Sequence, residues 1–213
     1  MNGVSDSAVR CRCGRVHRQD RFFDEVCRRG AWRDFSPEEH AKLRPLLDRM
    51  NIRAGEVIVE PGCGAGRMTR LLAERTGPSG RILAFDLSRE MVACAKAAGI
   101  AGATVERGCA HRLPLPGDGA DRVVCFHVFP HFSDPEEALR EFARVLRPGG
   151  TLWILHLSGR EAINDVHRAG PEAIRDHLLP PLDNLEDRIR RAGFEPVGGE
   201  DSETVYWLAA RRP

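Results

Sequence analysis

Length, composition and charge exclude several classes of protein. The chain has 213 residues and a formal net charge of +1, and its acidic and basic residues are interspersed. Because it has no basic stripe of the kind that binds a nucleic-acid backbone, we expect no nucleic-acid partner. No apolar run approaches the roughly 18 residues of a membrane span, and the N-terminus has no apolar core like that of a signal peptide. One compact domain accounts for a chain of this length.

The cysteines indicate a reducing compartment. There are seven of them, an odd number scattered through the chain, which fits reduced thiols better than a disulfide framework. We therefore expect a cytoplasmic protein. Cys11 and Cys13 form a CxC pair near His17 and Cys27, but a CxC pair without a matching second pair is weak support for a metal site. We predict no metal centre from this motif.

The N-terminal part is expected to be an extension, residues 1–35, ahead of a main domain that spans residues 36–213. Residues 1–33 are polar and rich in arginine without clear periodicity, which is typical of a mobile or lid-like segment. A helix should then begin behind Ser36, because Pro37 suits a first turn and Glu39 completes a capping box with Ser36. This helix should run to about Met50.

Alternating strands and helices are predicted after this helix. Apolar runs predict strands near residues 56–60, 81–85, 103–106, 122–126 and 151–156. Helices are predicted between them, near residues 67–75, 89–98 and 135–146. This alternation implies a parallel sheet covered on both faces. Two further helices are expected near 160–167 and 182–192, followed by two late strands near 194–198 and 204–210.

The most informative motif follows the first strand. Residues 57–66 read VIVEPGCGAG, an apolar run that ends at Glu60 and continues into Gly62, Gly64 and Gly66. A strand, a tight glycine turn and a helix start bring the backbone close to a nucleotide-like ligand. The second strand ends at Asp86, where a carboxylate can accept hydrogen bonds from both hydroxyls of a ribose.

These linked motifs resemble the class I, or Rossmann-like, S-adenosylmethionine-dependent methyltransferases. The glycine spacing is GxGxG rather than the GxGxxG of dinucleotide sites, and LPLP at 113–116, DRVVCFHVFPHF at 121–132 and RVLRPGGTLWILHL at 144–157 also fit the family. The resemblance covers the chain from about Ser36 and is strongest to the UbiE-like branch of small-molecule methyltransferases. It implies an α/β fold with a seven-stranded, mostly parallel sheet, helices on both faces and a C-terminal antiparallel strand.

The resemblance also implies S-adenosylmethionine as the cofactor and S-adenosylhomocysteine as the product. The glycines would lie along the methionine part, Glu60 at its amino end, Asp86 at the ribose, and Leu87 and Met91 on the adenine. The expected cofactor-binding residues are Glu60, Gly62, Cys63, Gly64, Gly66, Asp86, Leu87, Met91, Cys109, Ala110 and Phe126.

Cys109 departs from the family pattern, because relatives usually carry an acidic residue there that holds the adenine amino group. His111 is a candidate to replace that contact. The departure keeps open a second hypothesis, in which the chain is a non-catalytic partner protein that binds S-adenosylmethionine.

Histidines mark the predicted acceptor site. His127 and His156 end the fourth and fifth predicted strands, His131 lies just beyond the fourth, and His167 is on the following helix. In an open parallel sheet, ligands bind beyond the carboxyl ends of the strands. We therefore predict His127, His156 and His131 as catalytic residues that take a proton from an oxygen, nitrogen or thiol nucleophile. Two alternatives remain open: metal ligation, as in a metal- or metalloid-linked methyltransferase, and purely structural hydrogen bonds.

A polar stripe adds three substrate-binding candidates. Arg160, Asn164 and His167 recur at helical spacing and would share one face of a helix, although a solvated face explains the same pattern. The predicted reaction is direct displacement at the sulfonium methyl, with a small molecule as the acceptor. Alignment of the reacting groups alone can supply about 7 to 11 kcal/mol of the barrier reduction.

Overall fold

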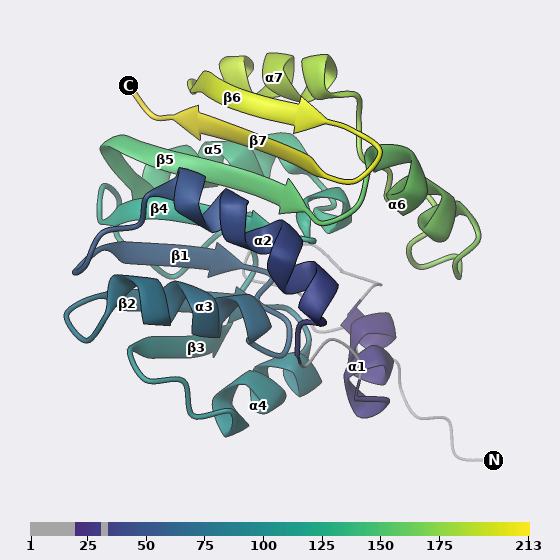
Figure 1. Ribbon diagram of the computed structural model, residues 1–213, viewed down its shortest axis with the longest axis horizontal. Coiled ribbons are helices and arrows are strands. Elements are labelled where there is room, and N and C mark those ends of the chain that lie inside the picture. The colour runs from purple at the N-terminus through teal and green to yellow at the C-terminus, as the bar shows by residue number, and fades with distance from the viewer. Residues whose placement is uncertain (1–19, 31–33) are drawn as a thin grey trace.

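A seven-stranded sheet forms the centre of the protein, which we describe from a computed structural model over residues 20–30 and 34–213. The strand order is β3-β2-β1-β4-β5-β7-β6 (Figure 1). β1 to β5 run parallel, and β7 is antiparallel to both β5 and β6. The predicted α/β fold and its C-terminal antiparallel strand are confirmed. The strands are β1 (Val57–Pro61), β2 (Arg81–Asp86), β3 (Ala103–Arg107), β4 (Ala120–Phe126), β5 (Leu146–His156), β6 (Glu195–Asp201) and β7 (Tyr206–Arg211).

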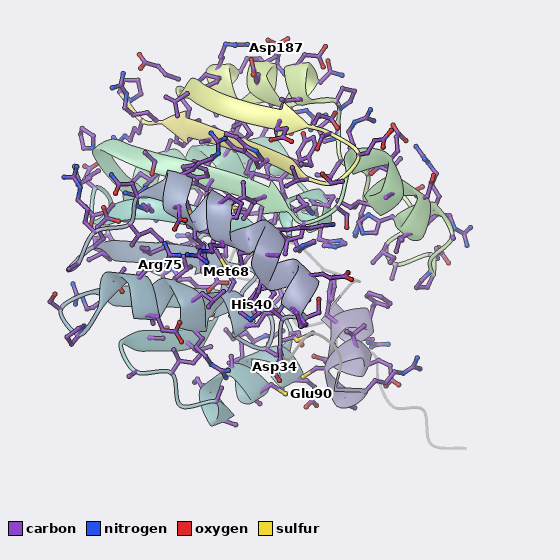
Figure 2. The ribbon with its side chains drawn as sticks, viewed as in Figure 1. Asp34, His40, Met68, Arg75, Glu90 and Asp187 are labelled. Atoms are coloured by element: carbon purple, nitrogen blue, oxygen red, sulfur yellow. The ribbon has the colours of Figure 1, made fainter. Side chains whose placement is uncertain are left out.

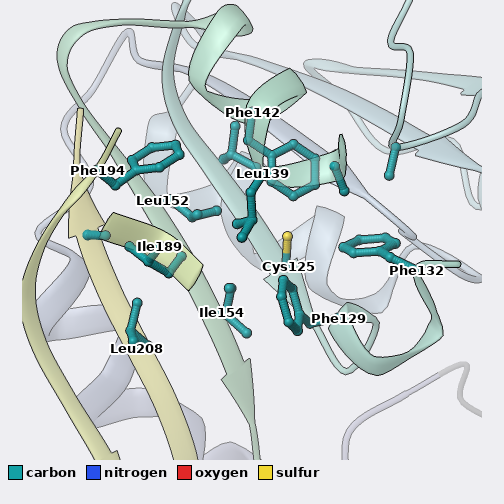
Figure 3. Close-up of a cluster of buried hydrophobic side chains, with 14 of the residues drawn as sticks. Cys125, Phe129, Phe132, Leu139, Phe142, Leu152, Ile154, Ile189, Phe194 and Leu208 are labelled. Atoms are coloured by element: carbon teal, nitrogen blue, oxygen red, sulfur yellow. The ribbon is translucent and has the colours of Figure 1, made fainter. Parts of the chain in front are cut away.

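Helices cover both faces of this sheet, because each face carries its own apolar cluster. Buried residues of α2, α3 and α4 pack on one face, and those of α5 and α7 pack on the other. Figure 3 shows part of the second cluster, where Phe142 and Leu139 of α5 and Ile189 of α7 surround residues of β4 and β5. The helices are α1 (Asp20–Arg28), α2 (Pro37–Met50), α3 (Arg67–Thr76), α4 (Arg89–Ala97), α5 (Pro135–Val145), α6 (Arg160–Arg168) and α7 (Leu182–Arg191), with a 3-10 turn η1 (Phe129–His131).

The predicted start of α2 is confirmed in detail. The Glu39 N–H donates to the Ser36 hydroxyl oxygen at 3.1 Å, and the Ser36 N–H donates to the Glu39 carboxylate at 2.9 Å. The helix ends at Met50, where Asn51 takes a left-handed conformation with φ of 49°. Two backbone N–H groups that have no partner within the helix are thus paired, which stabilises the N-terminus of α2.

The structure corrects the prediction around Pro148. The predicted strand begins near residue 151, whereas β5 already begins at Leu146, directly after α5. Leu146 pairs with Ala120 and Thr151 with Arg122, so the residues between them form an irregular bulge in the ladder with β4. Gly149 donates to the Arg212 carbonyl at 2.8 Å, and the Arg212 N–H donates to the Gly150 carbonyl at 2.9 Å. Proline is tolerated in this strand because the bulge removes the need for its N–H.

Two short elements were not predicted. α1 falls within the segment that we expected to lack periodicity, although it is strongly one-sided and packs beside α4 (Figure 1). η1 places Pro130 in its first turn, where a missing N–H does no harm, so proline excluded a longer helix but not this single turn. Cys11, Cys13 and His17 lie outside the described residues.

The carboxyl ends of the parallel strands meet on one side of the sheet, where the candidate site is expected. The arrowheads of β1, β4 and β5 point to the same side, towards α1 and α6 (Figure 1). Among the described residues, no helix is both long and apolar enough to cross a bilayer.

Candidate active site

A cavity of about 410 Å³ opens at the carboxyl ends of the parallel strands. The glycine loop after β1 and the end of β2 line one part of it. The residues after β4 and β5, together with side chains of α1 and α6, line the other part. The two parts are continuous, so a ligand along the glycine loop would have its far end next to the second part.

The glycine loop is held tightly against its neighbours. The Gly62 and Cys63 N–H groups donate to the Phe85 carbonyl at 2.6 and 3.0 Å. Gly62 has φ of +76°, and a Cβ there would lie 2.8 Å from the Cβ of Val128 and closer still to its Cγ2 methyl. Only glycine fits this position, both because of the backbone conformation and because of the approach of Val128.

Asp86 lies in the cavity wall, as predicted for a ribose-binding carboxylate. One carboxylate oxygen accepts from the Gly64 N–H at 2.9 Å and the other from the Ser88 N–H at 2.9 Å. Burial raises the pKa of Asp86 above its usual value, and these backbone hydrogen bonds act in the opposite direction. Each carboxylate oxygen can accept more than one hydrogen bond, so Asp86 retains capacity for two ribose hydroxyls.

Glu60, Cys63 and Gly66 occupy different places around the loop. Cys63 lines the cavity, whereas Glu60 and Gly66 are not among its lining residues. Glu60 is only 1% exposed, and the Thr69 hydroxyl donates to it at 2.6 Å. Burial raises the pKa of Glu60 to about 8, so its carboxyl is mostly protonated at neutral pH. A neutral Glu60 can still accept a hydrogen bond from an ammonium group through its carbonyl oxygen, but its place outside the cavity wall leaves its role at the amino end of the cofactor a prediction.

Of the other predicted cofactor-binding residues, four line the cavity and one does not. Leu87, Met91, Ala110 and Phe126 line the cavity, whereas Cys109 does not.

His111 also lines the cavity, but both of its ring nitrogens are engaged. The Asp134 N–H donates to Nε2 at 3.1 Å, and the Cys109 sulfur lies 3.0 Å from Nδ1. Neutral His111 thus holds its proton on Nδ1, towards the sulfur. It can replace the missing acidic residue only by giving up one of these contacts.

The structure brings the predicted histidines together. His127, His131, His156 and His167 all line the cavity. The ring centroids of His127 and His156 are 5.0 Å apart, and those of His131 and His167 are 4.9 Å apart. His177, which sequence reasoning missed, places Nδ1 3.0 Å from Nδ1 of His131. It lies in the irregular segment before α7, where no periodic pattern could have drawn attention to it.

Hydrogen bonds decide which ring nitrogens carry protons. The Leu157 N–H donates to Nε2 of His127 at 3.1 Å, so neutral His127 carries its proton on Nδ1. His167 donates from Nδ1 to the His177 carbonyl, which leaves its Nε2 as an acceptor. Nε2 of His156 is buried and has no hydrogen-bond partner within the described part of the chain.

His127, His131 and His156 are neutral at physiological pH, although only His156 is fully buried. Burial lowers the pKa of both His127 and His131 to about 3, with smaller contributions from Arg67 and from neighbouring histidines, respectively. Burial also lowers the pKa of His156 well below its ordinary value. These side chains are therefore weak bases that can still donate and accept hydrogen bonds.

Of the predicted polar stripe on α6, only His167 reaches the cavity wall. Arg160 donates to Asp201 at 2.8 Å and also pairs with Glu161. The Asn164 amide donates to the Leu179 carbonyl at 3.0 Å and accepts from the Leu179 N–H at 2.8 Å. Arg160 and Asn164 thus anchor the segment around α6.

Several lining residues were not predicted, because their reach into the cavity depends on how distant segments pack. Phe23 of α1 packs against His131, with ring centroids 5.0 Å apart. Arg67 pairs with Glu39 at 2.9 Å and lies over the Phe35 ring. Ser158 also lines the second part, together with five apolar residues that were not predicted: Val128, Phe132, Ala162, Ile163 and Val166. Within residues 20–30 and 34–213, no three histidine, cysteine or acidic side chains are arranged to hold a metal ion.

Comparisons with known proteins agree with this site. A family model described as a methyltransferase domain matches residues 59–154. A demethylmenaquinone methyltransferase of Anoxybacillus flavithermus is 31% identical over 182 residues, which cover 72% of this chain and 76% of the relative. The crystal structure of a SAM-dependent methyltransferase from Aquifex aeolicus matches with a TM-score of 0.71 at 20% identity, covering 89% of this chain and 98% of that one.

Other relatives are longer than this chain. An uncharacterized 37.1 kDa protein in a transposon of Streptomyces fradiae is 40% identical over 109 residues, which are 50% of this chain and 32% of the relative. The methyltransferase GfsG of Streptomyces halstedii is 29% identical over 159 residues, which are 70% of this chain and 56% of the relative. The chain thus spans about a third of the first protein and little more than half of the second.

A parallel sheet with a GxGxG loop, an acidic residue at the end of β2 and the matched domain together define the class. The chain belongs to the class I S-adenosylmethionine-dependent methyltransferases. The cofactor of this family is S-adenosylmethionine, and the residues present fit it. The glycine loop leaves no room for a side chain at Gly62, and Asp86 presents a carboxylate to the same cavity.

Proposed function

We propose that this protein transfers a methyl group from S-adenosylmethionine to a small-molecule acceptor by direct displacement. The observation that carries the proposal is one continuous cavity, with the glycine loop and Asp86 in one part and His127, His131 and His156 in the other. Bound S-adenosylmethionine would supply an electrophilic methyl group on a sulfonium. The surrounding residues orient the acceptor and exclude water, which is the main demand of a displacement reaction.

The second part of the cavity supports a small, uncharged acceptor. Among the described residues it is lined by imidazole, aromatic and aliphatic side chains and by the Ser158 hydroxyl, and Arg67, the one arginine or lysine of the described wall, is paired with Glu39. Within the described part of the chain, no arginine or lysine without an ionic partner lines this part of the cavity for a phosphate or carboxylate group. A relative named demethylmenaquinone methyltransferase also favours a small organic acceptor. We extend the proposal to a cytoplasmic enzyme without a nucleic-acid partner, on the interspersed charges of the chain.

The hydrogen bonds of the ring nitrogens suggest different roles for His127 and His156, as a donor and as an acceptor. His127 uses Nε2 for the Leu157 N–H, so its Nδ1–H is the group that can donate to the acceptor. His156 retains an unpartnered Nε2 that can accept a proton. Its lowered pKa makes it too weak a base to ionise a hydroxyl in advance. The acceptor oxygen becomes far more acidic as it gains the methyl group, and Nε2 of His156 then takes the proton.

The direct test supplies S-adenosylmethionine labelled with tritium in its methyl group and a panel of quinols, phenols and aliphatic alcohols. We expect label transfer to at least one of them by the wild type and much less by His156→Ala. Arg190→Ala, on the exposed side of α7, serves as the matched control and should retain activity. Saturable cofactor binding without transfer to any acceptor would instead favour the non-catalytic partner protein. Activity that a chelator abolishes would favour the metal-linked enzyme.

A further inference from the structure

Two cysteine sulfur atoms meet where α1 packs on α4. Sγ of Cys27 on α1 lies 2.7 Å from Sγ of Cys94 on α4. Cys27 is 3% exposed, whereas Cys94 is half-buried. The separation is closer than an ordinary contact between unbonded sulfur atoms and approaches the roughly 2.05 Å of a disulfide.

Polar contacts hold the two helices in this register. The Ser88 hydroxyl, which caps α4, donates to Asp24 of α1, and Arg28 of α1 donates to Glu90 of α4 at 3.3 Å. Glu90 lies beside α1 in Figure 2. These contacts join the same two helices as the sulfur pair, and the short separation of the sulfur atoms means that little movement is needed to bond Cys27 to Cys94.

We propose that Cys27 and Cys94 form an oxidation site, at which hydrogen peroxide produces a disulfide that links α1 to α4. Cys94 attacks peroxide first, because it is the more exposed thiol. The O–O bond breaks, and the products are a sulfenic acid on Cys94 and one water. Cys27 then attacks the Cys94 sulfur, and the hydroxyl leaves with the Cys27 proton as a second water. The two thiols lose two electrons, which reduce one peroxide to two waters.

The link has a consequence for the cavity. Phe23, one turn before Cys27 on α1, lines the acceptor part and packs against His131. In the reduced protein, α1 is tied to α4 by contacts that can break and reform. In the oxidised protein, a covalent bond keeps Phe23 in the cavity wall. Oxidation therefore fixes one wall of the acceptor site.

The test measures the bond itself and does not depend on methyl transfer. Full-length reduced protein is treated with hydrogen peroxide, alkylated and digested, and cross-linked peptides are mapped by mass spectrometry. We expect a Cys27–Cys94 peptide, loss of two titratable thiols, and slower hydrogen exchange in α1 than in the reduced protein. Cys125→Ala, which removes a buried cysteine far from the pair, should retain the link.

Single variants test the order of the two steps. Cys27→Ser should accumulate a sulfenic acid at Cys94 that dimedone traps, whereas Cys94→Ser should give little adduct at Cys27. Circular dichroism checks that both variants fold, and Cys27→Ala provides a second variant if Cys27→Ser does not. Oxidation that joins Cys27 to Cys11 or Cys13, or that leaves Cys27 and Cys94 as thiols, would overturn the proposal. So would stoichiometric zinc that is lost in both variants, because the pair would then be metal ligands.

Discussion

The fit of the glycine loop against Val128 gives the sharpest quantitative prediction. Gly62→Ala adds a Cβ at φ of +76°, 2.8 Å from the Cβ of Val128. The left-handed backbone alone costs about 1–2 kcal/mol for a residue with a side chain. Overpacking against a fixed neighbour adds about 1–3 kcal/mol. We therefore expect Gly62→Ala to lower the free energy of unfolding by about 2–5 kcal/mol, from the sum of these two ranges.

Gly99→Ala is the matched control for this experiment. Gly99 also has a positive φ, +60°, but a Cβ there would meet nothing within 4 Å. It should lose only the backbone contribution, and the difference between the two variants measures the overpacking. In thermal unfolding, each kcal/mol corresponds to about 2–4 °C for a protein of this size. Equal losses of Tm in both variants, or unchanged S-adenosylmethionine affinity in Gly62→Ala, would refute the account of the loop.

Three further predictions concern buried polar groups. Because the pKa of Glu60 is raised to about 8, the folded protein binds more protons than the unfolded chain between about pH 4.5 and 8, so stability falls with rising pH there. Histidines whose pKa values are lowered have the opposite effect, but only below about pH 6.5. In urea titrations, the free energy of unfolding of the wild type should fall between about pH 6.5 and 8, and that of Glu60→Gln should not. An unchanged fall in Glu60→Gln would show that the raised pKa of Glu60 is not its cause. Asn164→Ala should lower the free energy of unfolding by about 1–3 kcal/mol, because two backbone groups of Leu179 lose their partner. Calorimetry should show unchanged cofactor affinity; a loss of affinity at full stability would instead support a binding role for Asn164. His156→Ala should lower kcat by about 10²-fold with unchanged cofactor affinity, and full activity would reduce His156 to a structural role.

Local patterns predicted the parts of the fold that local physics decides. Ser36 and Glu39 marked a helix start because both partners of the capping box lie within one turn. The glycines after β1 marked a tight loop because positive φ angles strongly favour glycine. The alternation of strands and helices gave the sheet because parallel strands require crossovers.

The features that sequence reasoning missed depend on contacts between distant segments. Nothing near α1 in the chain indicates that Phe23 reaches a cavity whose other lining residues lie between Glu39 and His167. His177 pairs with His131 across 46 residues, and no local period signals such a pair. Arg160 shared helical spacing with His167, but its partner Asp201 lies on β6. Sequence spacing placed Arg160 and His167 on one face of a helix, and only the packed structure shows what each of them contacts.

The central claim is that this cavity binds S-adenosylmethionine through the glycine loop and Asp86. Isothermal titration calorimetry of wild-type protein with S-adenosylmethionine and S-adenosylhomocysteine tests it most directly, with Asp86→Ala as the site variant and Arg190→Ala as the control. The account predicts saturable binding of both ligands at one site in the wild type and the control, and a large loss of affinity in Asp86→Ala. No binding to the wild type, or equal binding by Asp86→Ala, would contradict it.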